Sequence, residues 1–200
     1  LHMTRTEIAD HIVSRLEAEL PRLPSGALEM TDQPWGGDVV YLAASDFTTP
    51  LTLFALDLNV MELTVMRRQP QQFVSDDIEV RQFWAVSSDG ERIPYFHVGK
   101  NAAPDTPTLV YAYGGFGVPE LPHYLGSIGK YWLEEGNAFV LANIRGGGEF
   151  GPRWHQAAQG ISKHKSVDDL LAVVRDLSER GMSSPQYIGL QGGSNGGLRS

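Results

Sequence analysis

Apolar residues repeat at helical spacing near the start of the chain and at strand spacing after it. Within residues 4–20 the apolar positions are 8, 12, 13, 16 and 20, which predicts a helix that ends before Pro21. From Ala27 to Val65 the pattern changes to short β-rich runs, at 38–43 and 51–56, with turn residues between them. These runs predict an antiparallel sheet of about three or four strands, which is too small to be stable without a packing partner.

The second part of the chain changes from paired strands to strands that alternate with helices. Residues 67–77 are polar and lack a period, which indicates a linker. Two β-rich runs, 80–86 and 93–98, flank an Asp-Gly dipeptide at 89–90, which is typical of a hairpin turn. From Thr108 onward the alternation predicts an α/β fold, with a parallel sheet and helices on both of its faces.

Three predicted strands of this α/β part each run into a glycine-rich loop. The strands are 109–113, 138–142 and 187–191, and the loops that follow them are 114–117, 145–151 and 192–197. Helices are expected at 127–135 and from Ser166, as the N-cap, to Gly181. The carboxyl ends of parallel strands meet at one edge of a sheet, where such folds bind their ligands, so we expect the candidate site there.

The third loop fits the pattern G-x-S-x-G, with Gly192, Ser194 and Gly196 in register. It follows an apolar run that we interpret as a buried strand, and this combination is typical of the nucleophile elbow of α/β hydrolases. The sharp turn from strand to helix puts the serine in a strained backbone conformation, and the glycines let neighbouring backbone pass close to it. The amide N–H of Asn195 then points to where an oxyanion would form.

A phosphate-binding loop is a competing interpretation of the same glycines. No Lys-Ser or Lys-Thr pair follows them, and the pattern G-x-G-x-x-G does not fit either. A plain glycine-rich turn that happens to contain a serine is the other alternative, and the strand directly before the loop argues against it.

Composition and charge narrow the classes of function. The chain has 200 residues, which suits one domain, or one domain and part of another. Its formal net charge of −8 argues against binding to nucleic acid or to a membrane surface. The chain contains no cysteine, and no pattern of histidines and carboxylates indicates a metal site, so we expect neither a metal nor a cofactor.

The cellular location is predicted from the start of the chain and from its apolar runs. No apolar run approaches the roughly 20 residues of a membrane span, and no signal peptide is visible. The tripeptide Leu1-His2-Met3 looks like a cloning remnant. We therefore expect a cytoplasmic protein, while a periplasmic location stays open because the native N-terminus is not shown.

Three motifs occur in an order and at a spacing that indicate a family. They are Tyr113-Gly114-Gly115-Phe116, residues 143–151 with Trp154-His155, and residues 192–197. Together they resemble the prolyl oligopeptidases, which are serine peptidases whose α/β-hydrolase domain is capped by a β-propeller. Oligopeptidase B is the nearest relative, but its elbow usually carries alanine after the serine, so Asn195 favours the prolyl branch.

The resemblance also implies how the chain is divided. It is close from about Val80 to the end of the chain, and weaker over residues 47–58, which are similar to part of a last propeller blade. We therefore expect the N-terminal part of an α/β-hydrolase domain, preceded by a small antiparallel β region. In residue numbers, the remnant is 1–3, the helix and propeller remnant are 4–75, and the partial peptidase domain is 76–200.

The family's roles carry over to the residues that match its motifs. The resemblance implies that Ser194 is the nucleophile and that the hydroxyl of Tyr113 forms the oxyanion hole with the N–H of Asn195. Phe116 would be a wall of the pocket that receives proline. The chemistry agrees, because a tyrosine O–H can donate to an oxyanion and an aromatic face suits a flat apolar ring. Without the resemblance, Tyr113 could be a half-buried strand residue and Phe116 a core residue.

The other candidate groups receive structural roles. In α/β hydrolases the triad follows the order Ser, Asp, His, and His155 and His164 both precede Ser194, so we reject them as the general base. We expect His97 and His123 at the surface. Glu149 is expected in an ion pair with Arg145 or Arg153.

The triad is incomplete in these residues, because the chain stops six residues after Ser194. The sequence therefore predicts a fragment of a peptidase that cleaves short peptides after proline, and the fragment is expected to be inactive alone. An exposed sheet edge would make it prone to self-association. The alternatives are an oligopeptidase B-like or esterase activity, or a non-catalytic piece that acts only by association.

Overall fold

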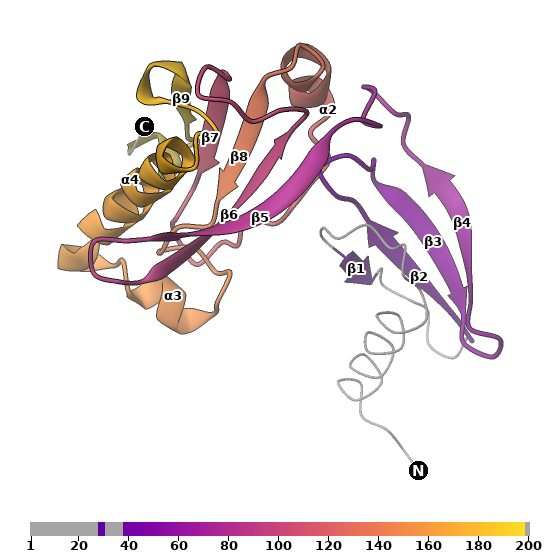
Figure 1. Ribbon diagram of the computed structural model, residues 1–200. Helices are drawn as coiled ribbons and strands as arrows, with labels where there is room; N and C mark the ends of the chain where they lie inside the picture. The colour runs from indigo at the N-terminus through magenta and orange to yellow at the C-terminus, as the bar shows by residue number, and fades with distance from the viewer. Residues whose placement is uncertain (1–27, 31–37, 199–200) are drawn as a thin grey trace.

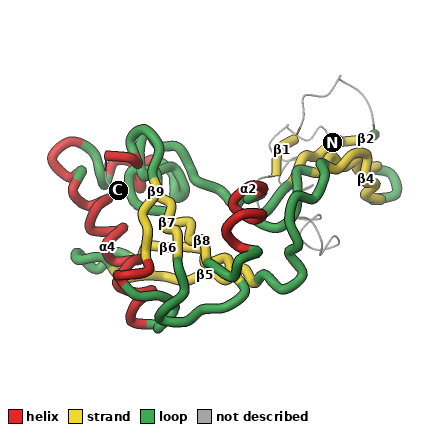
Figure 2. The backbone as a smooth tube through the Cα atoms, turned by 90° about the horizontal axis from the view of Figure 1, so that it is seen from above, coloured by secondary structure: helices red, strands yellow, loops and turns green. Residues whose placement is uncertain are grey.

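The computed structural model of the protein describes residues 28–30 and 38–198 (Figure 1). The helix expected at 4–20 lies outside the described residues. Two separate sheets account for all the strands described. Seen from above, the smaller sheet lies at one end of the molecule, apart from the larger sheet and its helices (Figure 2).

The smaller sheet is antiparallel, as predicted. Its strands are β1 (Leu28–Met30), β2 (Val39–Ala44), β3 (Thr52–Asp57) and β4 (Glu62–Arg68), in the order β1-β2-β3-β4. Alternate residues of β2 and β3 are buried in a small apolar cluster, as the period of two requires. Strand β4 continues through Arg68, so the segment that we expected to be a linker from residue 67 begins two residues later.

Phe47, in the loop between β2 and β3, joins the smaller sheet to the larger one. Its buried ring lies 5.5 Å from the ring of Phe96 and 6.5 Å from that of Phe139, measured between centroids. Its carbonyl oxygen accepts a hydrogen bond from the amide of Leu125 at 3.2 Å. The smaller sheet therefore gains the packing partner that its size demands.

The larger sheet is mixed rather than wholly parallel. Its strands are β5 (Glu79–Val86), β6 (Arg92–Gly99), β7 (Thr108–Ala112), β8 (Ala138–Ala142) and β9 (Ile188–Gln191), in the order β5-β6-β8-β7-β9. Strands β7, β8 and β9 are parallel, as the alternation predicted, whereas β6 pairs with both β5 and β8 in antiparallel fashion. The predicted hairpin therefore extends the parallel sheet at one edge.

Helices cover both faces of this sheet. The elements are α2 (Gly126–Ile128), a π-helical turn (Gly129–Leu133), α3 (Pro152–Gln156), α4 (His164–Glu179) and short 3-10 turns at Gly160–Ser162, Pro185–Tyr187 and Gly196–Leu198. Helix α4 packs Leu170, Val173 and Leu177 on one face of the sheet, while the segment from Leu125 to Leu133 packs on the other. None of the helices described is long and apolar enough to cross a membrane.

Three local expectations were wrong. Helix α4 begins at His164, so Ser166 lies inside it, where its buried hydroxyl donates to the carbonyl of Arg145 at 2.7 Å. Strand β9 is one of the two edge strands of the larger sheet and is mostly exposed, although its apolar residues indicated a buried strand. Such an edge can pair with another chain, which is the basis for expecting self-association.

The third wrong expectation was that His97 lies at the surface. It lies on β6 with only 1% of its surface exposed, and its Nε2 atom has no hydrogen-bonding partner among the described residues. Burial lowers the pKa of His97 to about 4. The residue therefore belongs to the core as a neutral imidazole, because a charged ring would be desolvated there without compensation.

Candidate active site

Ser194 lies in the turn that follows β9 and has the backbone conformation expected for an elbow. Its φ is +48°, in the left-handed region that a non-glycine residue rarely adopts. A side chain on Gly192 would overlap the backbone of Gly196, and one on Gly196 would overlap the carbonyl oxygen of Ala112. The two flanking glycines are therefore required by close backbone contacts, which the G-x-S-x-G pattern predicted.

The loop after β7 lies beside this turn, because β7 and β9 are neighbouring parallel strands. Tyr113 directly follows β7 and is half-buried. The side chain of Asn195 connects the two loops: its Nδ2 atom donates to the carbonyl oxygens of Tyr113 and Gly114, each at 3.3 Å. A side chain on Gly115 would overlap that of Asn195, so the glycine in this loop makes room for the asparagine.

This contact gives Asn195 a second role that sequence reasoning missed. The expectation for this residue concerned its backbone N–H alone. In the structure its buried side chain also holds the segment that carries Tyr113 next to Ser194. The signal in the sequence was the asparagine itself, which stands where oligopeptidase B usually has alanine.

Phe116 is exposed, which rules out the alternative that it is a core residue. Its side chain is 75% exposed, and both Phe116 and Gly117 have left-handed backbone, with φ of +55° and +66°. The amide of Val118 donates to the carbonyl of Gly115 at 3.0 Å and closes this tight turn. A left-handed phenylalanine costs about 1–3 kcal/mol, and such strain persists only where surrounding contacts enforce it.

A small cavity of about 220 Å³ lies behind the turn that carries Phe116. Its walls come from all three glycine-rich segments, and include Gly115, Phe116, Gly146, His155 and Asn195. The three loops singled out in the sequence therefore meet at one place, at the carboxyl edge of the parallel strands.

No histidine among the described residues acts on Ser194, whose exposed hydroxyl has no hydrogen-bonding partner there. The Nδ1 atom of His155 contacts the carbonyl of Gly146 at 2.8 Å, and those of His123 and His164, both exposed, contact backbone carbonyls close in sequence. Groups of ligands that could hold a metal ion are also absent from the described residues. The structure thus describes a nucleophile candidate without its base.

The expectation for Glu149 was wrong, because it pairs with neither arginine. Its Oε1 atom accepts hydrogen bonds from the amide of Glu120 at 3.0 Å and from the Nδ2 atom of Asn143 at 3.2 Å. Burial and the nearby charge of Glu149 raise the pKa of Glu120. Glu149 therefore fastens the loop after β8 to the loop that follows Phe116.

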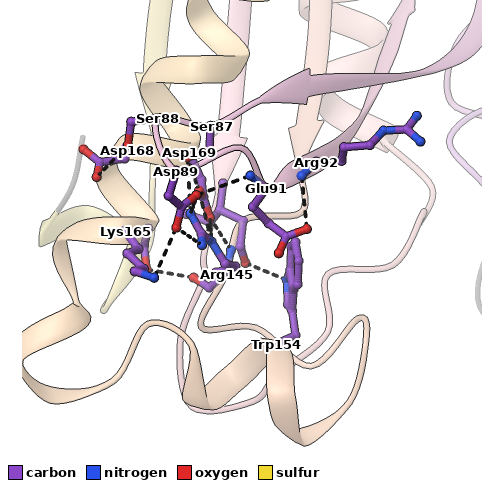
Figure 3. Close-up of polar contacts among 12 residues, drawn as sticks. Ser87, Ser88, Asp89, Glu91, Arg92, Arg145, Trp154, Lys165, Asp168 and Asp169 are labelled. Carbon is purple, nitrogen blue, oxygen red and sulfur yellow. Dashed lines mark hydrogen bonds and ion pairs between the residues drawn. The ribbon is translucent and has the colours of Figure 1, made fainter.

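Arg145 instead forms a cluster with the buried Asp169 and the exposed Asp89, which the sequence did not reveal (Figure 3). The Nη2 atom of Arg145 lies 2.6 Å from Oδ1 of Asp169, and its Nη1 atom lies 2.7 Å from Oδ2 of Asp89. Asp169 also accepts the backbone N–H of Arg145 and the hydroxyl of Ser87. Asp169 is fully buried and Arg145 is 3% exposed, so the charges compensate each other within the protein.

The cluster shifts the pKa values of Arg145 and Asp89 in the direction that ion pairing requires. The hydrogen bonds that Arg145 donates to Asp169 raise the pKa of Arg145 further above its usual range, and those that it donates to Asp89 hold the pKa of Asp89 well below its usual range. Asp89 comes from the hairpin turn and Asp169 from α4, so the cluster joins both to the loop after β8.

The chain is similar to known proteins in sequence and in structure. Residues 125–200 match the prolyl oligopeptidase family. An uncharacterized peptidase of Sinorhizobium fredii is 40% identical over 177 residues, 87% of this chain and 24% of that protein. A prolyl endopeptidase of Elizabethkingia meningoseptica is 32% identical over 162 residues, 80% of this chain and 23% of that protein. A solved structure of a post-proline cleaving enzyme from Rickettsia typhi matches with a TM-score of 0.80 and 36% identity, over 89% of this chain and 26% of that one.

The matched relatives are much longer than this chain, which spans about a quarter of their length. The match nevertheless covers both sheets, since it extends over most of the chain in sequence and in structure. The family model matches the part of the chain that carries Arg145 and Ser194, and the related sequences and solved structures match most of the chain. The chain belongs to the prolyl oligopeptidase family.

Proposed function

We propose that this chain supplies the nucleophile and the oxyanion hole of a serine peptidase that cleaves short peptides after proline. The observation that carries the proposal is Ser194, a left-handed residue with an exposed hydroxyl in the turn after β9. The hydroxyl attacks the scissile carbonyl and its proton passes through a general base to the amine that leaves as the peptide bond breaks, and water then hydrolyses the acyl-enzyme to the free acid and Ser194. The names of relatives from Elizabethkingia meningoseptica and Rickettsia typhi support cleavage after proline.

Under this proposal, activity requires a general base next to Ser194. None of the described residues fills this role. We therefore use the term complete enzyme for a longer protein, of the kind found among the relatives. It contains this chain together with further residues that supply the histidine and aspartate of the triad. In the same proposal the smaller sheet is part of a propeller blade. The 200-residue chain alone should show no turnover of a glycyl-prolyl amide.

Other activities remain alternatives to be tested. An oligopeptidase B-like enzyme or an esterase would use the same serine, and a non-catalytic piece would use none of these residues. Asn195 and the exposed ring of Phe116 favour the prolyl activity, because an aromatic face suits the flat apolar ring of proline.

The test is to incubate the complete enzyme with a mixture of short peptides and to locate the cleaved bonds by mass spectrometry. We expect cleavage on the carboxyl side of proline, together with covalent labelling of Ser194 by a fluorophosphonate. Cleavage after lysine and arginine would favour the oligopeptidase B-like alternative. Labelling without any peptide cleavage would favour an esterase.

Tyr113→Phe tests the oxyanion hole in the complete enzyme. We expect kcat to fall about 10²–10³-fold, the usual cost of one oxyanion donor, while the N–H of Asn195 keeps part of the activity. Substrate binding should weaken less than kcat falls, because the donor acts mainly as negative charge develops. Steady-state kinetics, under conditions where acylation limits the rate, measure this effect. The control is Tyr131→Phe, which changes an exposed tyrosine on the π-helical turn. A kcat within about twofold of the parent enzyme would remove Tyr113 from the mechanism.

Phe116→Ala tests the proline pocket. Because the ring is exposed, its removal should leave folding intact and cost apolar contact with the substrate alone. We expect kcat/KM for proline-containing substrates to fall by the equivalent of about 1–3 kcal/mol, with less change for substrates that carry alanine at the cleaved position. An unchanged preference for proline over alanine would show that Phe116 does not contact this residue of the substrate.

A further inference from the structure

The carbonyl oxygen of Gly146 accepts two hydrogen bonds from different parts of the chain. One comes from the amide of Gly117, at 3.1 Å, and the other contact is the Nδ1 atom of His155, at 2.8 Å. Gly117 directly follows Phe116 in the left-handed turn. A single carbonyl therefore joins the segment that carries Phe116 to helix α3, which carries His155.

The contacts of the His155 ring define which nitrogen carries its proton. A carbonyl oxygen can only accept, so Nδ1 must be the protonated nitrogen of a neutral ring. The other nitrogen, Nε2, lies 2.5 Å from the side-chain Nε2 atom of Gln159, an amide N–H₂ group that donates. Both contacts agree with one tautomer, in which Nδ1 donates to Gly146 and Nε2 accepts from Gln159.

The same ring packs against the turn itself. A side chain on Gly117 would lie 3.4 Å from the ring of His155, so the ring covers this face of the turn. On another side, a side chain on Gly148 would overlap the carbonyl oxygen of Gly117. Gly117 is thus enclosed by His155 and by the loop after β8, and it has little freedom to move.

These contacts explain how a strained turn stays in place at the surface. Phe116 itself is exposed, so core packing does not fix its left-handed backbone. Strain of this kind persists where neighbouring groups over-determine the conformation. Around Phe116 those groups are the Gly117 amide bond, the carbonyl of Gly146 and the ring of His155.

We propose that His155 is a positioning residue that holds the Phe116 turn and thereby determines the preference for proline at the cleaved position. This inference rests on the function proposed above. Without the Nδ1 hydrogen bond the carbonyl of Gly146 loses one of its two donors and the peptide can rotate. The turn can then relax, and the ring of Phe116 leaves the position in which it meets a proline ring.

Two substitutions of His155 test whether its Nδ1 hydrogen bond to Gly146 is required, or whether any polar side chain at this position is sufficient. The amide of asparagine reaches the position of Nδ1 in histidine, whereas that of glutamine reaches the position of Nε2. In the complete enzyme we expect His155→Gln to lower the ratio of kcat/KM for proline over alanine substrates about tenfold, and His155→Asn to keep most of this ratio. Hydrolysis of a small activated ester, which does not depend on the pocket, should change little in either variant.

His164→Asn is the matched control. His164 is exposed and its Nδ1 atom also contacts a backbone carbonyl, that of Ile161 at 3.0 Å, but this carbonyl does not contact the Phe116 turn. We expect an unchanged ratio in this variant. Equal ratios in His155→Gln, His155→Asn and the parent enzyme would overturn the proposal, and so would equal losses of ester and peptide hydrolysis in His155→Gln.

A second measurement needs neither activity nor a substitution. Nitrogen-15 NMR of the histidine rings in the folded protein distinguishes the two neutral tautomers, and we expect the proton of His155 on Nδ1. A proton on Nε2 would overturn the hydrogen bond and with it the inference. If the complete enzyme cleaved no peptide although the Nδ1 tautomer was found, the proposed function would fail and the specificity role would fail with it, whereas the hydrogen bond would stand.

Discussion

Replacing Ser194 by alanine in the complete enzyme should lower kcat for peptide substrates by about 10⁶-fold. The loss of a nucleophile in a catalytic triad has this magnitude because the covalent route disappears and only the oxyanion hole and substrate binding remain. Alanine keeps the same left-handed backbone at similar cost, so the variant should fold like the parent. Single-turnover kinetics and labelling with a fluorophosphonate measure the effect directly.

Ser127→Ala is the control for this experiment, since Ser127 is an exposed serine on α2. We expect unchanged kcat and unchanged labelling in that variant. If Ser194→Ala kept more than about a tenth of the parent kcat, the serine would not be the nucleophile and the proposed function would be wrong.

The second large effect concerns the stability of the fold rather than the reaction. Asp169→Ala should lower the free energy of unfolding of the chain by about 3–5 kcal/mol, which is the usual cost of leaving one member of a buried ion pair without its partner. Asp169 is fully buried and accepts hydrogen bonds from the guanidinium and amide of Arg145 and from the hydroxyl of Ser87. Urea denaturation followed by tryptophan fluorescence provides the measurement.

The neighbouring residue supplies the matched control. Asp168 lies on the same helix and only accepts a 3.3 Å contact from the hydroxyl of Ser88, so Asp168→Ala should change stability by less than about 0.5 kcal/mol. Arg145→Met in the Asp169→Ala background should recover part of the loss, because it removes a buried charge whose remaining carboxylate partner is the exposed Asp89. Equal effects of Asp168→Ala and Asp169→Ala would contradict the assigned role of the cluster.

The sequence predicted the elements near the site well because local chemistry requires them. The strand before Ser194 and the glycines at 192 and 196 follow from the close backbone approach at a sharp turn. The hairpin at residues 89–90 follows from the conformational preferences of Asp-Gly. Such patterns report contacts between residues close in sequence, so they can be recognised without a tertiary structure.

The electrostatic partners could not be predicted in the same way. The sequence assigned no partner to Asp169, and Glu149 was assigned to Arg145 or Arg153. The structure pairs Arg145 with Asp169, 24 residues later, and with Asp89, 56 residues earlier. A carboxylate and an arginine carry no sequence signal for a partner at this separation, because the folded backbone alone decides which charges become buried together.

The sequence by itself determined the alternation of strands and helices, the elbow around Ser194 and the three glycine-rich loops, because each depends on periodicity or on local steric limits. Tertiary structure alone decided that β6 joins the sheet in antiparallel fashion, that His97 is buried, and that the side chain of Asn195 holds the loop of Tyr113. It also decided that the carbonyl oxygen of Gly146 accepts hydrogen bonds from both the amide of Gly117 and the ring of His155. These features arise where segments distant in sequence meet, and their free energy comes from burial and hydrogen bonds that exist only in the folded chain.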